Sequence, residues 1–143
     1  TSDYSAYDRN HDISVDGKLP LLCSSDPAFR GDKTRYNPEE LLVASLSECH
    51  MLCFLELCPI QGVSVTAYSD EATGHMQENP DGSGQFTEVV LNPKVTVAEE
   101  SMAEKANALH DKAHQMCFIA RSVTFPVRHN PKAIAAGPRS IPR

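Results

Sequence analysis

The stretch NPEELLVASLSECHMLCFLELC, residues 37–58, decides the fold of this chain. Asn37 is a candidate N-cap, Pro38 suits the first helical position, and Glu40 stands where a capping box needs its acid. Pro59 follows the stretch as a stop signal. The pattern therefore predicts a helix of about 21 residues, on the order of 30 Å long.

This predicted helix is apolar on nearly every side. Its length would allow it to cross a bilayer, but it carries Glu48, His50 and Glu56, each of which is costly in hydrocarbon. We therefore interpret it as a buried core helix and expect no membrane partner. For a chain this short, a sheet and a partner subunit could both be needed to cover it.

The flanking sequence predicts several strands, of which 63–68 and 86–97 together form an antiparallel meander. Alternating apolar residues and turn signals place these strands at 12–23 (a hairpin), 63–68, 86–97 (broken at Asn92-Pro93) and 122–128. Between the last two, Ser101 and Glu104 predict a second capping box that opens an amphipathic helix ending near Cys117. The expected class is thus α+β.

Length and charge limit the classes of function. The 143 residues, 15.7 kDa, suit one domain over 1–143, with a loosely packed tail from about 130. Thirteen Lys and Arg against nineteen Asp and Glu give a net charge of −6, which argues against nucleic acid as a partner. No secretory signal is visible and the five cysteines form an odd set, so we expect reduced thiols and a cytoplasmic location.

Two cysteines on different predicted helices are the candidates for chemistry. Cys49 lies in the middle of the long helix and Cys117 at the end of the amphipathic one. Two helices crossing in one core could bring the thiols together. Spacing alone favours inert packing, and the alternative is a peroxidatic thiol with its resolving thiol.

The position of Cys49 in its helix determines what can assist it. Cys53, at i+4, lies on the same helix face as Cys49, but a disulfide between these positions would be strained, so we favour a packing role for Cys53. Cys58 points to the opposite side of the helix. A mid-helix thiol gains little from the helix dipole, so some cation must stabilise the thiolate. The arginines outside the helices and the tail are candidates: Arg9, Arg30, Arg35, Arg121 and Arg128.

A carboxylate such as Glu39 could orient that guanidinium through a bidentate pair. Glu39 precedes Cys49 by ten residues, about 15 Å along a straight helix. Glu39 therefore cannot act directly on the thiol of its own chain, and the next subunit must provide it.

Histidines suggest two further kinds of site. His110 and His114 are spaced i, i+4, and Cys117 follows three residues later, so these side chains could bind zinc. We favour the alternative that both histidines are solvated on a helix face. His50 lies about 100° around the helix from Cys49 and is poorly placed as a base for acyl transfer.

Two segments carry a resemblance to a known family. Asn37 to Leu52, NPEELLVASLSECHML, and Leu109 to Val123, LHDKAHQMCFIARSV, resemble the OsmC/Ohr family of thiol-dependent hydroperoxide reductases, in a less characterised OsmC-like branch. The resemblance implies antiparallel sheets around two long central helices in an intertwined homodimer, with two active sites at the subunit interface.

The resemblance also implies roles for individual residues. Cys49 would be the peroxidatic thiolate, Cys117 the resolving thiol, and Glu39 the carboxylate partner of a catalytic arginine. Arg9, within AYDRNHDI, fits that arginine best, and Arg35 is the reserve choice. The resemblance assigns no role to Cys23, Cys53 or Cys58.

The implied activity is reduction of organic hydroperoxides through a Cys49 sulfenic acid and a Cys49–Cys117 disulfide. A dithiol reductant, lipoyl-bearing in better-known relatives, would close the cycle, and no metal or flavin is needed. Apolar helix surface around Cys49 would favour alkyl or fatty-acid hydroperoxides. The alternative from another class is a non-catalytic dimeric binding or thiol-sensing module on the same fold.

Overall fold

The computed structural model describes residues 1–137 as an α+β fold, so the end of the expected tail, 138–143, lies outside the described residues. The chain separates into two compact units, Thr1–Leu42 and the part that begins at Val43. Each unit is described by itself below, and the assignment of 1–143 to a single domain stays a prediction.

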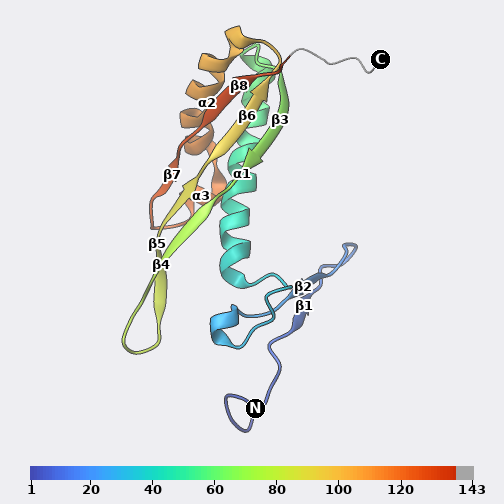
Figure 1. Cartoon of the computed structure of the whole chain (residues 1–143), viewed down its shortest axis with the longest axis vertical. Coiled ribbons are helices and arrows are strands. Elements are labelled where there is room, and N and C mark those ends of the chain that lie inside the picture. The colour runs from blue at the N-terminus through green and yellow to red at the C-terminus, as the bar shows by residue number, and fades with distance from the viewer. Residues whose placement is uncertain (138–143) are drawn as a thin grey trace. The chain divides into compact units, whose positions relative to one another are not determined.

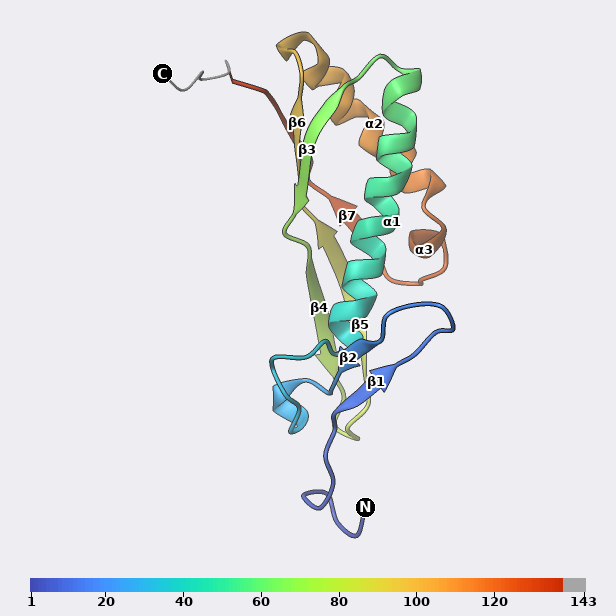
Figure 2. The ribbon, with the colours of Figure 1, turned by 90° about the vertical axis from the view of Figure 1, so that its right-hand side faces the viewer.

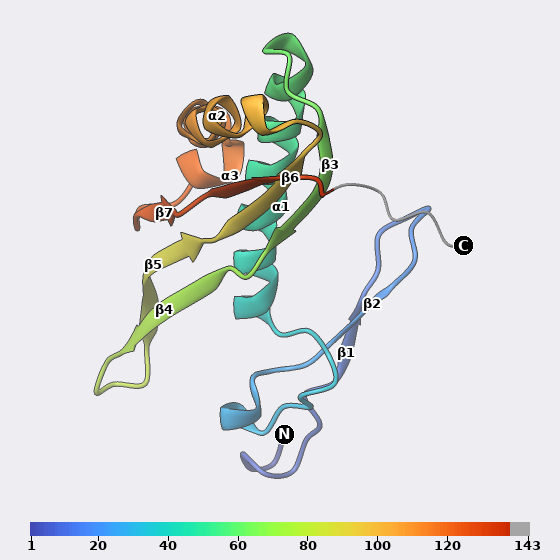
Figure 3. The same ribbon diagram turned by 45° about the horizontal axis from the view of Figure 1, so that its top comes forward.

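The N-terminal unit contains the expected hairpin. Strands β1 (His11–Ile13) and β2 (Leu21–Cys23) lie side by side (Figure 3). They pair antiparallel, with His11 opposite Cys23. Gly17 in the connecting turn has φ +78°, a conformation that glycine adopts without steric cost. The polar loop that follows includes a short 3₁₀ helix, η1 (Pro27–Phe29).

Helix α1 (Pro38–Ile60) begins where its capping signals place it. The backbone N–H of Glu40 donates to Asn37 Oδ1 (2.9 Å), and Glu40 Oε1 accepts from the backbone N–H of Asn37 (3.2 Å), so the predicted capping box is confirmed. The helix ends two residues later than we expected. Gly62, with φ +72°, then reverses the chain, and the N–H of Val63 bonds to the carbonyl of Cys58 (2.9 Å).

Two three-stranded sheets form the second unit, in the orders β3-β6-β8 and β4-β5-β7. Their strands are β3 (Val65–Asp70), β4 (Thr73–Glu78), β5 (Gly84–Leu91), β6 (Pro93–Val97), β7 (Val127–His129) and β8 (Lys132–Ala135). The pairs β3–β6 and β4–β5 are antiparallel, but β5–β7 and β6–β8 are parallel. The antiparallel pairing expected within 63–97 is therefore confirmed, and the parallel addition of β7 and β8 makes both sheets mixed.

The chain passes from one sheet directly into the other three times, from β3 into β4, from β5 into β6 and from β7 into β8. The predicted break at Asn92-Pro93 is confirmed, because β5 ends at Leu91 and β6 begins at Pro93. The backbone N–H of Asn92 donates to Asp70 Oδ1 (2.6 Å), and the N–H of Asn130 donates to the carbonyl of Leu91 (2.9 Å). One side chain and one backbone hydrogen bond thus satisfy backbone groups where the ladders stop.

The C-terminal third differs most from the sequence prediction. The 3₁₀ helix η2 (Glu100–Met102) precedes helix α2 (Ala103–Met116), which has no side-chain cap, so the Ser101 capping box is wrong. A short helix, α3 (Phe118–Arg121), follows, and the strand expected over 122–128 begins only at Val127. Residues 132–135, expected in a loose tail, form β8.

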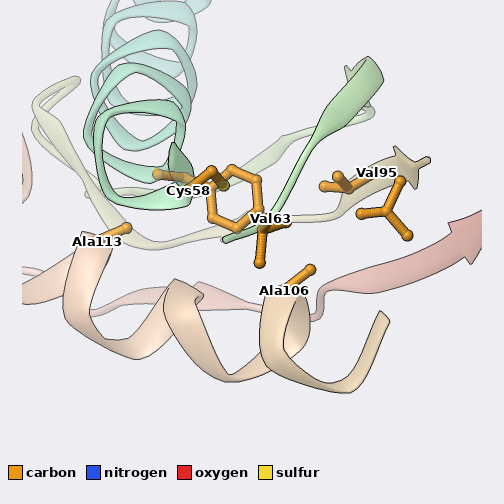
Figure 4. Close-up of a cluster of buried hydrophobic side chains, with 7 residues drawn as sticks. Cys58, Val63, Val95, Ala106 and Ala113 are labelled. Atoms are coloured by element: carbon orange, nitrogen blue, oxygen red, sulfur yellow. The ribbon is translucent and has the colours of Figure 1, made fainter. Parts of the chain in front are cut away.

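Helices α1 and α2 lie on the same face of the sheets (Figure 2). The buried stripe of α1 has i, i+4 spacing and consists of Leu46, His50, Phe54 and Cys58. Ala106 and Ala113 of α2 are buried in the same core (Figure 4), where their small side chains allow close approach of the backbone. Packing, not sequence periodicity, therefore selects which side of α1 is buried.

Other parts of α1 are not covered within this chain. Leu52 is 60% exposed and Ile60 is 75% exposed. The expectation that most sides are covered is thus not met by one chain alone. By length and composition α1 also qualifies as a membrane span, and it is equally compatible with the core helix of a soluble protein.

Candidate functional site

The structure brings Cys49 and Cys117 together. Cys49 is half-buried and lies in the middle of α1, the long helix labelled in Figure 1. Cys117 is buried at the junction of α2 and α3, where its extended backbone (φ −69°, ψ 112°) separates the two helices. Its sulfur accepts a hydrogen bond from the backbone N–H of Ala120 (3.4 Å). Each thiol also affects the pKa of the other, so the two side chains are neighbours.

The surroundings of Cys49 favour its thiolate. Burial opposes ionisation, but the backbone N–H of Ile119, the Cys117 thiol, the backbone N–H of Phe118 and the Cys53 thiol together lower the pKa of Cys49 below its ordinary value. Hydrogen-bond donors stabilise the negative charge and leave the neutral thiol less favoured. At Cys49 these hydrogen-bond donors thus outweigh the effect of burial on the pKa.

These donors add to what the sequence predicted. Backbone N–H groups of Phe118 and Ile119 contribute to the lowered pKa of Cys49 within the second unit, and the expected cation beside the thiolate stays a prediction. Both belong to the turn immediately after Cys117. The element that carries the second thiol therefore also tunes the first, and no sequence motif reports backbone donors of this kind.

The partner thiol has the opposite tendency. Burial raises the pKa of Cys117 to about 11, and the neighbouring Cys49 adds to the rise. Cys58 is buried too, and burial raises its pKa to about 11. The pair Cys49–Cys117 therefore combines a thiol that ionises readily with one that keeps its proton.

The arginines and the carboxylate expected at the site lie in the N-terminal unit. Arg9 bonds to the carbonyls of Tyr4 and Tyr7, and its guanidinium lies 3.6 Å from the centre of the Tyr7 ring. Arg35 forms an ion pair with Asp12 (3.2 Å). Their roles toward Cys49 stay predictions.

Glu39 differs from the arginines because one of its oxygens is unsatisfied. Its Oε2 atom is buried and has no hydrogen-bond partner within residues 1–137. A carboxylate oxygen without a partner carries a desolvation cost that a cation would remove.

Histidines that we expected on a solvated helix face form a buried cluster instead. His50 Nε2 lies 2.9 Å from His110 Nδ1, the His50 and His110 rings are stacked at 5.2 Å, and both side chains are buried. His129 stacks on His50 (5.6 Å) and also contacts His114 (5.4 Å). Because α1 is apolar on nearly every side, no sequence pattern marks His50 as part of its buried stripe, and the cluster emerges only from the packing of α1 against α2.

The two buried histidines of the cluster, His50 and His110, are held in their neutral form. Burial, followed by repulsion from His129 and His114, lowers the pKa of His50 to about 4. Burial, followed by repulsion from His50, lowers the pKa of His110 to about 3. In residues 1–137 no three His, Cys, Asp or Glu side chains are arranged to hold a metal ion.

Comparison with known proteins places this arrangement in a family. A family model described as OsmC-like protein matches residues 31–132. A solved structure of an OsmC-like protein of unknown function from Vibrio cholerae is 35% identical, covers 87% of this chain and 85% of its own, and has a TM-score of 0.80. A search of curated proteins gives no significant match.

More distant solved structures share the fold. An organic hydroperoxide resistance protein OsmC from Legionella pneumophila is 22% identical, with a TM-score of 0.68 over 87% of this chain and 89% of its own. An organic hydroperoxide resistance protein from Elizabethkingia anophelis is 19% identical, with a TM-score of 0.67 over 90% of both chains. Because the family model spans most of the sequence and the fold agrees throughout, the chain belongs to the OsmC-like family.

Proposed function

We propose that this protein is a thiol peroxidase that reduces organic hydroperoxides to alcohols. Membership of the OsmC-like family suggests a peroxidase-like role, and two distant structural relatives are named for organic hydroperoxide resistance. The observation that carries the proposal is the interaction of Cys49 with Cys117, in which the pKa of Cys49 is lowered by hydrogen bonds that outweigh burial.

The proposed reaction has two steps on the protein. The Cys49 thiolate attacks one oxygen of R–O–O–H, so that the O–O bond breaks, Cys49 becomes a sulfenic acid, and R–O⁻ leaves and takes up a proton. The Cys117 thiol then condenses with the sulfenic acid, which forms a disulfide and releases water. A dithiol reductant, which a lipoyl-bearing protein would supply, restores both thiols and is itself oxidised to a disulfide.

Arg9 and Glu39 complete the proposed site. The unsatisfied Oε2 of Glu39 supports a bidentate pair with a guanidinium, which would then face the thiolate. Arg9 is our choice and Arg35, already paired with Asp12, is the reserve. Because Glu39 is ten residues before Cys49 in α1, we propose that it serves the thiol of the second subunit in a homodimer.

Exposed apolar side chains support both the dimer and the substrate class. Leu52 is 60% exposed one turn from Glu48, and Phe118, next to Cys117, is 80% exposed. Contact with apolar surface gains about 0.8 kcal/mol per buried CH₂, so alkyl and fatty-acid hydroperoxides should react in preference to hydrogen peroxide. With all five cysteines free, we assign the protein to the cytoplasm.

One experiment tests the proposal directly. The reduced protein is mixed with an equimolar amount of cumene hydroperoxide, and peptide mass spectrometry locates any new disulfide. We expect a Cys49–Cys117 disulfide in the wild type. The Cys49→Ser variant should form no such bond and consume no peroxide, whereas the matched control Cys58→Ser should behave like the wild type. Unchanged peroxide and thiols in the wild type would refute the proposal and favour a non-catalytic dimeric binding or thiol-sensing module.

The arginine assignment is tested by a second pair of variants. Arg9→Ala should abolish peroxide consumption, whereas Arg35→Ala should retain most of it. The reverse result would move the role to Arg35.

A further inference from the structure

A polar hollow lies in the second unit where its two sheets meet. The volume of this hollow is about 370 Å³, at the lower end of the range of small-molecule sites. Apart from Pro93, the side chains that line it are polar or charged: Ser69, Glu71, Asn92, Lys94, Asn130 and Lys132. None of them belongs to the thiol site, so an inference from this hollow is independent of the proposed function.

The hollow coincides with interruptions in the strands. Asn92 lies between β5 and β6, and its side-chain Nδ2 donates a hydrogen bond to the carbonyl of Glu71 (3.0 Å), which lies between β3 and β4. Asn130 lies between β7 and β8. Because the strands are interrupted at these positions, amide side chains border the hollow where a regular ladder would continue.

Two lysines stand directly opposite each other in the hollow. Lys94 of β6 is in register with Lys132 of β8 on one side and with Ser69 of β3 on the other. Neighbouring strands are about 4.8 Å apart, so both ammonium groups can reach one ligand. Pro93 and Val95 are buried and Lys94 between them is exposed, so Lys94 projects from the sheet face opposite the helices (Figure 2).

The two positive charges are not neutralised within the chain. In residues 1–137 no carboxylate forms an ion pair with Lys94 or Lys132. The carboxylate of Asp70, next to the hollow, is engaged elsewhere, because its two oxygens accept from the backbone N–H of Asn92 (2.6 Å) and from the Ser47 hydroxyl (2.6 Å). Like charges directly opposite each other weaken a sheet. An anion bound between the lysines would remove this repulsion.

We propose that the hollow is a binding site for a small phosphate monoester, whose phosphate lies between Lys94 and Lys132. Such a phosphate carries a charge of about −1.5 to −2 at pH 7, which two ammonium groups match. Lysine binds phosphate as a point charge, whereas bidentate carboxylate recognition favours arginine, and no arginine lines the hollow in the described part of the chain. The remaining lining is polar, with Glu71 and two asparagines, and suits a hydroxylated alcohol portion.

The test measures binding of glycerol 3-phosphate to the whole reduced protein by isothermal titration calorimetry at pH 7.5. Potassium sulfate at the same ionic strength supplies a dianion without the alcohol, and glycerol supplies the alcohol without the charge. We expect saturable binding of glycerol 3-phosphate at one site per chain, at least about tenfold tighter than that of either comparison ligand. No saturable binding, or equal affinity for sulfate, would overturn the proposal.

Charge variants locate the site. Lys94→Gln and Lys132→Gln should each weaken binding of glycerol 3-phosphate about tenfold or more, the loss expected for a bond between charged groups. Lys112→Gln removes an exposed lysine of α2 and makes the same change in net charge, and it should bind like the wild type. Wild-type affinity in both hollow variants, or an equal loss in Lys112→Gln, would count against the site.

A second measurement separates a role in binding from a role in the fold. Without ligand and at low salt, Lys94→Gln should melt about 1–3 °C above Lys112→Gln, because repulsion from Lys132 is removed. Glycerol 3-phosphate should raise the Tm of the wild type and of Lys112→Gln but not that of Lys94→Gln. A lower Tm of ligand-free Lys94→Gln than of Lys112→Gln would assign Lys94 to the fold and contradict the proposal.

Discussion

Two neighbouring faces of α1 carry opposite kinds of residue. One face, which we call the thiol face, holds Cys49 and Cys53, both half-buried, with the Cys49 pKa lowered by hydrogen-bond donors. The other, the aromatic face, holds His50 and Phe54, both buried, with the His50 pKa lowered by burial. The face to which we assign reactivity and the face that contributes to the stability of the fold are thus separated by about 100° around the helix axis. Substitutions on the two faces should therefore have different consequences.

The largest expected effect contrasts Phe54→Ala with Cys49→Ser. The Phe54 ring is 0% exposed and stacks on His110 at 4.1 Å, so its removal should lower the free energy of unfolding by about 3–5 kcal/mol. Cys49→Ser changes one half-buried atom and should cost less than about 1 kcal/mol while it abolishes activity. Urea denaturation measures both. Equal losses of stability would erase the distinction between the faces.

Acid should weaken the aromatic face selectively. The pKa of His50 is about 4 and that of His110 about 3 in the folded chain, against 6.5 in the unfolded one, chiefly because of burial. Below pH 6.5 the unfolded state binds protons that the folded state does not. The free energy of unfolding should therefore be steady above pH 6.5 and fall by a few kcal/mol between pH 6.5 and about 4.

A variant isolates the histidine contribution from that of the carboxylates. His110→Phe should flatten this fall, because an apolar ring takes up no proton, while His75→Gln, at an exposed position of β4, should leave it as in wild type. Urea denaturation at pH 7.5, 6, 5 and 4 makes the comparison. An equal slope in wild type and His110→Phe would exclude the cluster as the source.

Alkylation should rank the thiols by face. The lowered pKa of Cys49 and the burial that raises the pKa of Cys58 to about 11 predict that iodoacetamide modifies Cys49 at least about tenfold faster at pH 7.5. Cys23 is buried and should also be slow. Peptide mass spectrometry with time gives the rates. Comparable rates at Cys49 and Cys58 would contradict the assignment of reactivity to the thiol face.

The smallest effect concerns an exposed charge beside the thiol face. After burial and the two effects of Cys49, the Glu56 carboxylate makes the last contribution to the raised pKa of Cys53. Glu56→Gln should therefore speed alkylation of Cys53 by no more than a few-fold, since solvent screens the carboxylate. High salt should reduce the difference between variant and wild type. A slower reaction of Cys53 would reverse the sign that we assign to this charge.

The sequence predicted those features of the fold that depend on interactions between residues close together in the chain. The start of α1 follows from Asn37, Pro38 and Glu40, which act within one turn, and the break at Asn92-Pro93 follows from the residues at the break. Likewise, helix rotation alone placed Cys53 beside Cys49.

Features that depend on distant segments were not predictable in this way. Parallel pairing of β8 with β6 depends on residues almost forty positions apart, and nothing within 130–137 signals a strand. The burial of His110 depends on His50 and Phe54 from another helix. Two of the donors for Cys49 are backbone N–H groups. Because nearly every residue has such a group, the sequence does not indicate which of them will face the thiol.

The parallel pairs have a consequence for synthesis of the protein. A ribosome releases the chain from its N-terminus, so β5 and β6 emerge together with β4 and β3, each still lacking the neighbour on its other edge. Those edges receive β7 and β8 only when residues 127–135 have left the exit tunnel. A nascent chain halted before that point presents open strand edges, which are templates for aggregation. The arrival of residues 127–135 thus decides whether the molecule closes these sheet edges or leaves them open to another chain.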